Sequence, residues 1–393
     1  MSALPTVRLK GRLNSPHPWV WRTRLEASSL PRRAEPGALV RVVDGAGEPV
    51  GLGLLHPHVS IGLRLLTRDP AEAIDAAFFR RRFEAARRLR EDVLRLGEVG
   101  DAYRLMHGEA DGISGLVVDV LGEVVRVDLF ARGLARFQDE LRAALEALYP
   151  GKSVVVRADA HSADVEGFRV RPRPDDPTRT EVTEHGVRFE VDLREGHKTG
   201  FFLDQRENRD FLARLVRGRS LLDVHCYTGG FSLHAAVRGE ARQVVGVDID
   251  EKAIAVAKRN AKRNQARVRF VRADAFPYLR DCLRRGERPE VLVLDPPKLA
   301  RGRKERAEGL RVYGDLNRLG LEVVAEGGLL LTCSCSGAVS EEDFLDVLRR
   351  SAARTRKELT VLRVAGAAAD HPVGLHVPET RYLKAVFARV RSL

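Results

Sequence analysis

The carboxyl-terminal half of the chain alternates short apolar runs with segments whose apolar residues recur at helical spacing. Each apolar run is only a few residues long, as expected of a buried strand. Strands alternating with helices predict an α/β domain with a Rossmann-like, doubly wound, mainly parallel sheet. The predicted elements are strands at 220–225 (SLLDVH), 244–249 (VVGVDI), 268–274 (VRFVRAD), 291–295 (VLVLD), 328–334 (GLLLTCS) and 382–390 (YLKAVFARV), with helices from about 230 and at 251–263, 276–285, about 304–325 and 340–351.

The first 68 residues have a different pattern, with short β-like runs separated by frequent turns. LVRVVD at 39–44 is followed by the turn Gly45-Ala46-Gly47, and IGLRLLT at 61–67 alternates apolar and polar residues. Such spacing predicts a small β-barrel.

The middle of the chain predicts a separate α/β domain. A helix should bury one face, followed by two strand-like runs at 102–108 and 115–130, a helix, and a strand at 154–159. The proline-rich, charged segment 171–180 (RPRPDDPTRT) predicts a loop or linker. We therefore expect three domains at 1–70, 71–185 and 186–393. The predicted buried face of the first helix comprises Phe79, Phe83, Ala86, Leu89 and Val93.

Composition and charge narrow the class of protein. The 393 residues are 44% hydrophobic and 31% charged, which is typical of a water-soluble globular chain. No apolar run reaches the length of a membrane span, and residues 1–30 lack the apolar core of a signal peptide. A net charge of +12 favours a polyphosphate partner such as RNA, although solvated arginine-rich helices would give the same total.

The four cysteines form neither a disulfide framework nor a zinc motif. Cys226, Cys282, Cys333 and Cys335 show no paired CxxC spacing, and the histidines are scattered. We therefore expect no metal and a reducing cytoplasm as the compartment. A metal hydrolase is disfavoured for the same reason.

Acidic residues at the ends of successive predicted strands indicate a nucleoside-binding site. Ligands of doubly wound sheets bind beyond the carboxyl ends of the strands. The first strand leads into Asp223-Val-His-Cys-Tyr227-Thr-Gly229-Gly230, where glycines allow close backbone approach. Asp248 could accept hydrogen bonds from both ribose hydroxyls, and Asp274 could accept one from the adenine amino group. Helix capping is the structural alternative for either acid. The turn lacks GxGxxG, so a dinucleotide is not favoured.

Two longer motifs resemble a known family. DVHCYTGGFS at 223–232 resembles the first motif of class I S-adenosylmethionine-dependent methyltransferases, and GHKTGFFLDQRENR at 196–209 is similar to the KTGFFLDQRxNR signature of bacterial 23S ribosomal RNA 5-methylcytosine methyltransferases of the large-subunit methyltransferase I type. His197 departs from the glutamine common there. The resemblance extends to 10–12 and 17–20, which look like the start of a PUA RNA-binding barrel, to EADGISGLVVD (109–119), and to ADHPV (369–373).

The resemblance implies S-adenosylmethionine as cofactor, 23S ribosomal RNA as partner, and a homodimer. It places Lys198 and Gln205 beside the donor and the target base. Tyr227 would contribute to the cofactor site with Gln205, Asp223, Gly229, Asp248, Asp274 and Asp295.

The chemistry of carbon 5 of cytosine explains why a thiol and an acid should meet in such a site. That carbon becomes nucleophilic only after a thiolate adds to carbon 6, and an acid at N3 stabilises the resulting charge. Asp295, in VLVLDPP, is the candidate acid, and the resemblance favours Cys335 over Cys333 as the nucleophile. Cys333 is more simply interpreted as a small buried hydrophobe. Lys298 occupies the position at which related families carry a second cysteine.

Several alternatives remain open. A guanine N2 RNA methyltransferase shares the Asp-Pro-Pro motif but needs no cysteine. Uracil C5 methylation also uses a thiol, although the likeness to that family is poorer in the amino-terminal half. Leu294 and Lys298 disfavour an exocyclic-amine methylase of the NPPY type. A non-catalytic RNA-binding assembly factor would use the barrel and basic surface without binding a methyl donor.

Overall fold

The computed structural model describes residues 4–30, 35–194 and 200–393. The chain divides into two compact units. The first comprises Met1–Glu181, Asp192–Thr199 and Asp370–Thr380, and the second comprises Val182–Val191, Gly200–Ala369 and Arg381–Leu393. The three-domain division at residues 70 and 185 stays a prediction. No helix in the described ranges is long and apolar enough to cross a membrane.

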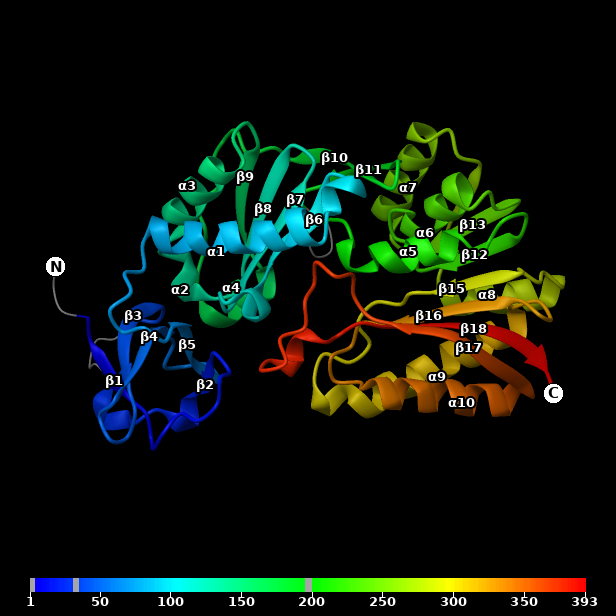
Figure 1. Cartoon of the computed structure of the whole chain (residues 1–393). Helices are drawn as coiled ribbons and strands as arrows, with labels where there is room; N and C mark the ends of the chain where they lie inside the picture. Colours follow the sequence, from blue (N-terminus) through cyan, green and yellow to red (C-terminus); the bar gives the residue numbers. More distant parts are fainter. Residues whose placement is uncertain (1–3, 31–34, 195–199) are drawn as a thin grey trace. The chain divides into compact units, whose positions relative to one another are not determined.

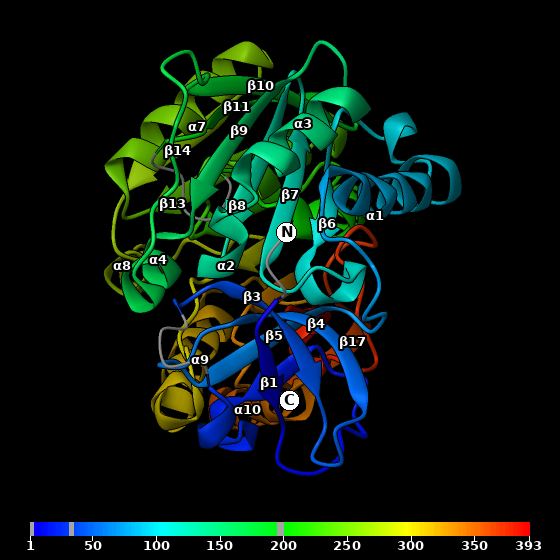
Figure 2. The ribbon, with the colours of Figure 1, turned by 90° about the vertical axis from the view of Figure 1, so that its left-hand side faces the viewer.

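A five-stranded sheet begins the first unit, in the region where the sequence predicts a barrel. Its order is β1-β3-β4-β5-β2, with β1 parallel to β3 and the other pairs antiparallel. Figure 2 shows β1, β3, β4 and β5 in blue. Alternating valines and leucines, such as Val40 and Val42, fill its core. The strands are β1 Thr6–Arg8, β2 Trp19–Trp21, β3 Ala38–Val43, β4 Pro49–Leu55 and β5 Ile61–Thr67, with short helical turns at Arg22–Arg24 and Ala27–Ser29.

The rest of the first unit is a four-stranded sheet with helices. The sheet order is β6-β7-β8-β9, and only the β8–β9 pair is parallel. The single apolar run predicted at 115–130 is in fact a hairpin of β7 and β8, because Gly122 adopts a positive φ of 57° and turns the chain. The elements are α1 Ala76–Arg88, β6 Ala102–His107, β7 Leu116–Leu121, β8 Val124–Leu129, α2 Arg132–Ala135, α3 Gln138–Leu148, β9 Ser153–Ala158 and α4 Ala160–Glu166, with helical turns at Leu96–Glu98 and Gly108–Asp111.

The predicted buried face of α1 is correct at three positions and wrong at its end. Phe79, Phe83 and Ala86 are buried, whereas Val93 is 69% exposed. A π-helical turn at Leu89–Val93 follows α1. Its wider turn changes which of the following side chains face the core. Arg90 is buried in consequence, and its guanidinium donates two hydrogen bonds of 2.7 Å to Asp111.

The second unit contains a seven-stranded sheet of order β14-β13-β12-β15-β16-β18-β17. The first five strands are parallel, and β18 is antiparallel to both of its neighbours, β16 and β17. The strand order reverses between β12 and β15, so a ligand should bind at their carboxyl ends. The strands are β12 Ser220–Val224, β13 Gln243–Asp248, β14 Val268–Arg272, β15 Val291–Leu294, β16 Leu329–Ser334, β17 Lys357–Ala365 and β18 Lys384–Ser392.

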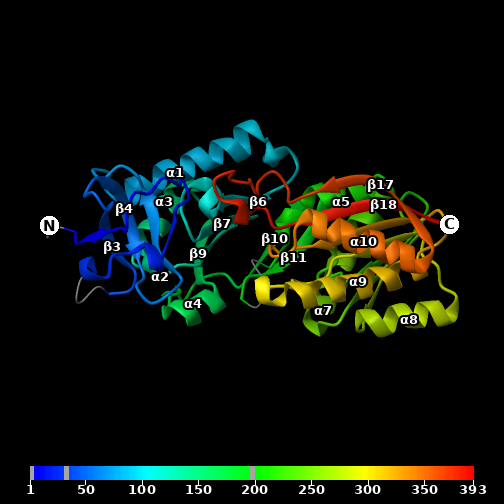
Figure 3. The same cartoon turned by 90° about the horizontal axis from the view of Figure 1, so that it is seen from below.

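Helices cover both faces of this sheet, as a doubly wound fold requires. Figure 1 shows α5, α6 and α7 on one side and α9 and α10 on the other, and Figure 3 shows α8, α9 and α10 together. Separate apolar cores lie on the two faces. The helices are α5 Arg206–Ala213, α6 Gly230–Leu233, α7 Glu251–Arg263, α8 Ala275–Arg285, α9 Arg306–Val323 and α10 Glu341–Thr355, with a π turn at His234–Arg238 and 3-10 turns at Leu203–Gln205, Arg303–Glu305 and Pro378–Thr380.

Beyond the amino-terminal sheet, three of the described strands were not predicted from the sequence. β10 (Arg179–Glu184) and β11 (Val187–Asp192) form a two-stranded sheet that begins within the predicted linker. β17 pairs with β18 at the sheet edge, where most of its side chains are at least partly exposed. Its apolar residues therefore do not form the continuous run that marks the buried parallel strands.

Candidate active site

The loop between β12 and α6 lies at the predicted switch point and has an unusual backbone. His225, Tyr227 and Gly229 adopt positive φ values of 63°, 48° and 89°. A Cβ atom on Gly229 would lie 2.8 Å from Cζ of Phe270, so only glycine fits there. Asn260 of α7 donates to the carbonyl of Thr228 at 3.2 Å and fixes the loop from below. The turn therefore has a fixed, glycine-dependent conformation at the carboxyl end of β12, the edge of the sheet at which ligands of this fold bind.

Asp223 is fully buried at the base of this loop. Its Oδ2 accepts hydrogen bonds from the backbone N–H of Ser232 at 3.0 Å and from the Ser232 hydroxyl at 2.7 Å. Within the described residues its Oδ1 accepts none. Burial raises the pKa of Asp223 to about 7, and the nearby carboxyl groups of Asp295 and Asp248 act in the same direction. The ammonium group of an S-adenosylmethionine molecule would be a partner of opposite charge for this carboxyl group, so the residue fits that cofactor.

Asp248 and Asp274 also lie where the sequence places them, each with a structural task. The carboxylate of Asp248, at the end of β13, accepts from the backbone N–H of Tyr227 at 2.8 Å and of Asp250 at 2.9 Å. Asp274 caps α8 by accepting from the N–H of Phe276 at 2.9 Å. Helix capping therefore accounts for the position of Asp274, and binding of adenine by this residue stays a prediction.

Gln205, in the sequence motif at 196–209, connects that motif to the Asp-Pro-Pro turn. Its amide nitrogen donates to Oδ2 of Asp295 at 3.1 Å, and its amide oxygen accepts from Asn208 at 2.6 Å. Asn208 also donates to the carbonyl of Gly366 at 3.2 Å. The chain Asn208–Gln205–Asp295 fixes the orientation of the amide, which in turn fixes the carboxylate.

Cys335 and Asp295 lie at the carboxyl ends of neighbouring strands. β15 and β16 are paired in parallel, with Leu294 opposite Thr332. The thiol of Cys335 is partly exposed and lies 4.0 Å from the carbonyl oxygen of Pro296. Cys333, by contrast, is fully buried in an apolar core, and burial raises the pKa of its thiol well above the usual range. The accessible thiol beside Asp-Pro-Pro is therefore that of Cys335.

A buried polar network holds the segment that follows Cys335. The hydroxyl of Ser336 accepts from the N–H of Ala300 at 3.0 Å and lies 3.0 Å from the hydroxyl of Tyr313 on α9. The ammonium of Lys384 on β18 donates to the carbonyls of Ser336 and Val339, both at 2.7 Å, and of Tyr382 at 2.9 Å. Tyr313 and Lys384 were not predicted from the sequence.

A second buried cluster connects α5 with β10 and with the π turn that follows α6. Arg209 donates two 2.7 Å hydrogen bonds to Glu184 and one of 2.9 Å to the carbonyl of Phe202. His234 lies 3.1 Å from the same Glu184 carboxylate. The Arg209 guanidinium holds the pKa of Glu184 well below its usual range although burial opposes this. Asn208 and Arg209 are the last two residues of the QRxNR motif, so that motif was the sequence feature from which their role could have been predicted.

The other predicted site residues are placed as follows. Tyr227 packs edge-on against Phe202, with ring centroids 5.0 Å apart. Lys198 lies outside the described residues. Cys226 and Cys282 are buried, and burial raises the pKa of both thiols, that of Cys282 to about 11. Neither thiol is suited to nucleophilic attack.

The comparisons with known proteins identify the class of this site. Residues 103–373 match the S-adenosylmethionine-dependent methyltransferase family, and residues 8–68 match the PUA-like domain. Among solved structures, the methyltransferase SMU.776 in complex with SAH shares the fold, with a TM-score of 0.82 at 20% identity over 98% of this chain and 99% of that chain. A methyltransferase from Streptococcus mutans gives a TM-score of 0.79 at 19% identity, over 98% and 100%.

Curated relatives are similar along the whole chain. Ribosomal RNA large subunit methyltransferase I from Escherichia coli strain K12 is 35% identical over 394 residues, which covers 98% of both chains. The same protein from Escherichia coli O9:H4 strain HS gives the same values. The chain therefore belongs to the S-adenosylmethionine-dependent methyltransferase family of ribosomal RNA large subunit methyltransferase I, with an amino-terminal PUA-like domain. The expected fold class and cofactor are confirmed.

Proposed function

We propose that this enzyme methylates carbon 5 of a cytosine in 23S ribosomal RNA, with Cys335 as nucleophile and Asp295 as the group that holds the base. The observation that carries the proposal is the meeting of a partly exposed thiol and an oriented carboxyl group at the ends of β15 and β16. The 35% identity to ribosomal RNA large subunit methyltransferase I supports a ribosomal RNA substrate. Such a substrate implies a cytoplasmic enzyme, and a homodimer stays a prediction.

The proposed chemistry assigns one task to each residue. The Cys335 thiolate adds to carbon 6, forming an S–C bond and moving the electrons of the C5–C6 double bond toward carbon 5. Asp295, donating a proton to a hydrogen bond with N3, stabilises the charge that develops on the ring. Bound S-adenosylmethionine supplies the electrophilic methyl group. A base then removes the carbon 5 proton, and the returning electron pair expels the thiolate.

The rival activity is methylation of guanine N2, which needs no thiol. The accessible Cys335 beside the Asp-Pro-Pro turn has no task in that reaction, so it favours cytosine. The discriminating experiment incubates the enzyme and labelled S-adenosylmethionine with 23S RNA from cells that lack the activity, and then separates the nucleosides. We expect label in 5-methylcytidine. Label in N2-methylguanosine would replace the proposal with its rival, and no label transfer with RNA binding intact would favour an assembly factor.

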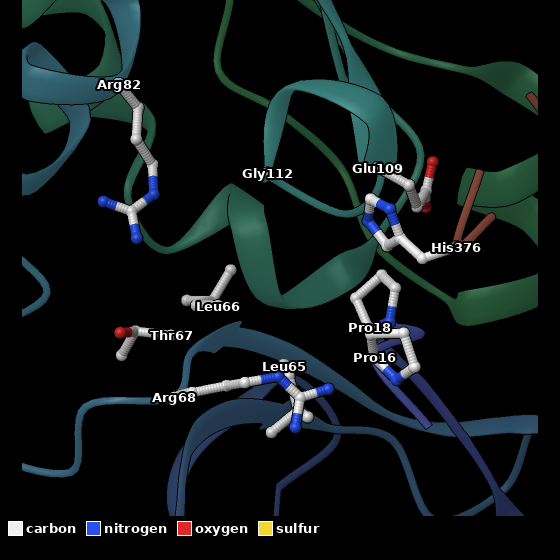
Figure 4. Close-up of a pocket in the computed structure, with 10 residues that line it drawn as sticks. All are labelled: Pro16, Pro18, Leu65, Leu66, Thr67, Arg68, Arg82, Glu109, Gly112 and His376. Atoms are coloured by element: carbon white, nitrogen blue, oxygen red, sulfur yellow. The ribbon is translucent and has the colours of Figure 1, made fainter. Parts of the chain in front are cut away.

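RNA should also contact a pocket in the first unit. The pocket has a volume of about 230 Å³, smaller than the roughly 300 Å³ at which sites for drug-sized ligands begin. Figure 4 shows Arg82, Arg68 and His376 around it, with Pro16 and Pro18 among the apolar side chains. Two guanidinium groups beside an apolar wall suit one phosphate and one base of a single strand.

Replacing Arg68 and Arg82 together with alanine is therefore expected to weaken RNA binding. Loss of two phosphate contacts should reduce the slope of log affinity against log salt by about 1.5, with about a tenfold loss of affinity at low salt. Titrations at several salt concentrations measure both quantities. The matched control is the alanine pair at Arg171 and Arg173, exposed arginines of the same unit. Equal slopes in the two double variants would show that the pocket is not an RNA contact.

A further inference from the structure

Lys384 is a buried cation next to the candidate nucleophile, and no step of the proposed reaction uses it. It begins β18 and pairs with Ser334, the last residue of β16, so its side chain lies against the segment that starts with Cys335. Only 4% of Lys384 is exposed. Burying an ammonium group is costly unless its charge is used or compensated.

The hydrogen bonds of Lys384 indicate which protonation state the site holds. Its nitrogen donates to three carbonyl oxygens, those of Ser336, Val339 and Tyr382. An ammonium has three protons and can donate to all three carbonyls, whereas a neutral amine has two and can donate to only two of them. Burial lowers the pKa of Lys384 to about 8, and the neighbouring Cys335 opposes that decrease. The group is therefore mainly charged near neutral pH, and the interaction with Cys335 favours the charged state.

The other charged and titratable groups around Cys335 show why a cation is useful there. Asp295 lies at the end of the adjacent β15, and whenever this group is ionised, before it takes part as the protonated donor to N3, its charge disfavours a second anion nearby. Cys333 on β16 and Tyr313 on α9 also interact electrostatically with Cys335, and neither contributes a positive charge. Around Lys384 itself lie Arg381 and the acids Glu341 and Asp343.

We propose that Lys384 is a positioning residue for Cys335: its ammonium group anchors the 336–339 loop through three carbonyls and stabilises the Cys335 thiolate electrostatically. The inference rests on the proposed role of Cys335. It adds a residue from the antiparallel end of the sheet to a site otherwise built on the parallel strands. The thiol proton is released to solvent, and Lys384 keeps its own protons throughout.

The test is the pH dependence of alkylation of Cys335, which does not require catalysis. Folded wild-type enzyme and Lys384→Gln are treated with iodoacetamide between pH 5.5 and 10.5, and modification of the Cys335 peptide is followed by mass spectrometry. Loss of a nearby opposite charge shifts a pKa by about 1–3 units, so we expect at least about tenfold slower alkylation of the variant at pH 7. The rates should converge at high pH, where both thiols are ionised. Lys357→Gln, which removes another lysine of the same sheet, should behave as wild type.

Two outcomes separate this inference from its alternatives. If Lys384→Gln lowers the melting temperature but leaves the midpoint of the alkylation profile unchanged, Lys384 is only a structural anchor and the inference is overturned. If the midpoint shifts but Cys335→Ala keeps methyl transfer, the inference holds for the thiol and the proposed function fails instead.

A measurement on the wild-type protein covers the case in which Lys384→Gln does not fold. An adjacent cation attracts the anionic reagent iodoacetate, so the rate ratio of iodoacetate to iodoacetamide at Cys335 should fall at least about threefold when the protein is unfolded in urea. An unchanged ratio would count against the inference.

Discussion

Replacing Cys335 with alanine is expected to abolish methyl transfer, with kcat falling by at least about 10⁴-fold. Removal of a catalytic nucleophile leaves only the binding and electrostatic contributions of the site, which explains losses of this size. Binding of S-adenosylmethionine should persist, because the loop between β12 and α6, the expected donor site, does not depend on the thiol. Single-turnover transfer of labelled methyl to 23S RNA measures the rate, and calorimetry measures donor binding.

Cys333→Ala is the matched control for that experiment. Cys333 lies two residues earlier on the same strand but is fully buried in the apolar core. Its replacement should cost about 1 kcal/mol of stability and leave kcat near the wild-type value at 25 °C. Loss of transfer in Cys333→Ala alone would support the thiol mechanism but identify Cys333 as the nucleophile. Full activity of both variants would exclude a thiol mechanism altogether.

The second large effect is expected from Asp295→Asn, which keeps the size of the side chain and removes its acidity. General acid–base groups contribute about 10²–10⁴-fold, so kcat should fall within that range. The carboxamide can still meet Gln205, whose amide nitrogen lies 3.1 Å from the Asp295 carboxylate. The fall should therefore reflect the reaction and not a displaced loop. Rapid-quench kinetics with saturating RNA and donor give the number.

Asp274→Asn provides the comparison for Asp295→Asn. It makes the same chemical change at an exposed helix cap on the neighbouring part of the sheet. Binding of adenine by Asp274 predicts a higher KM for S-adenosylmethionine with little change in kcat. If Asp295→Asn also changes only this KM, Asp295 serves the donor and not the base, and the assignment at N3 is wrong.

The sequence predicted the parallel part of the fold well because buried strands and amphipathic helices give strong periodic signals. The helix expected at 251–263 has those bounds in the structure, and the Asp248 and Asp295 carboxyl groups lie at strand ends as expected. Pattern analysis failed where local geometry changes the register. A π turn after α1 exposes Val93 and buries Arg90, and the spacing of apolar residues does not predict such a turn.

The residues that support the site were harder to predict because they depend on pairing between distant strands. Lys384 reaches the segment after Cys335 only because β18 inserts antiparallel between β16 and β17. Tyr382 likewise donates a 2.6 Å hydrogen bond to Asp204, 178 residues earlier. The spacing of residues along the sequence does not predict either contact. The long motif at 196–209 marked the region of Gln205 and Arg209, but not the partners that orient them.

Attack of Cys335 on carbon 6 of a cytosine can be trapped with RNA that contains 5-fluorocytidine. Fluorine at carbon 5 prevents loss of a proton after methyl transfer, so the thiol cannot be expelled and the adduct should accumulate. We expect a covalent enzyme–RNA complex that resists denaturation, forms only with S-adenosylmethionine, and yields the Cys335 peptide bonded to a methylated nucleotide. Absence of the complex from an enzyme that methylates unmodified RNA, or attachment at another residue, would show that Cys335 is not the nucleophile.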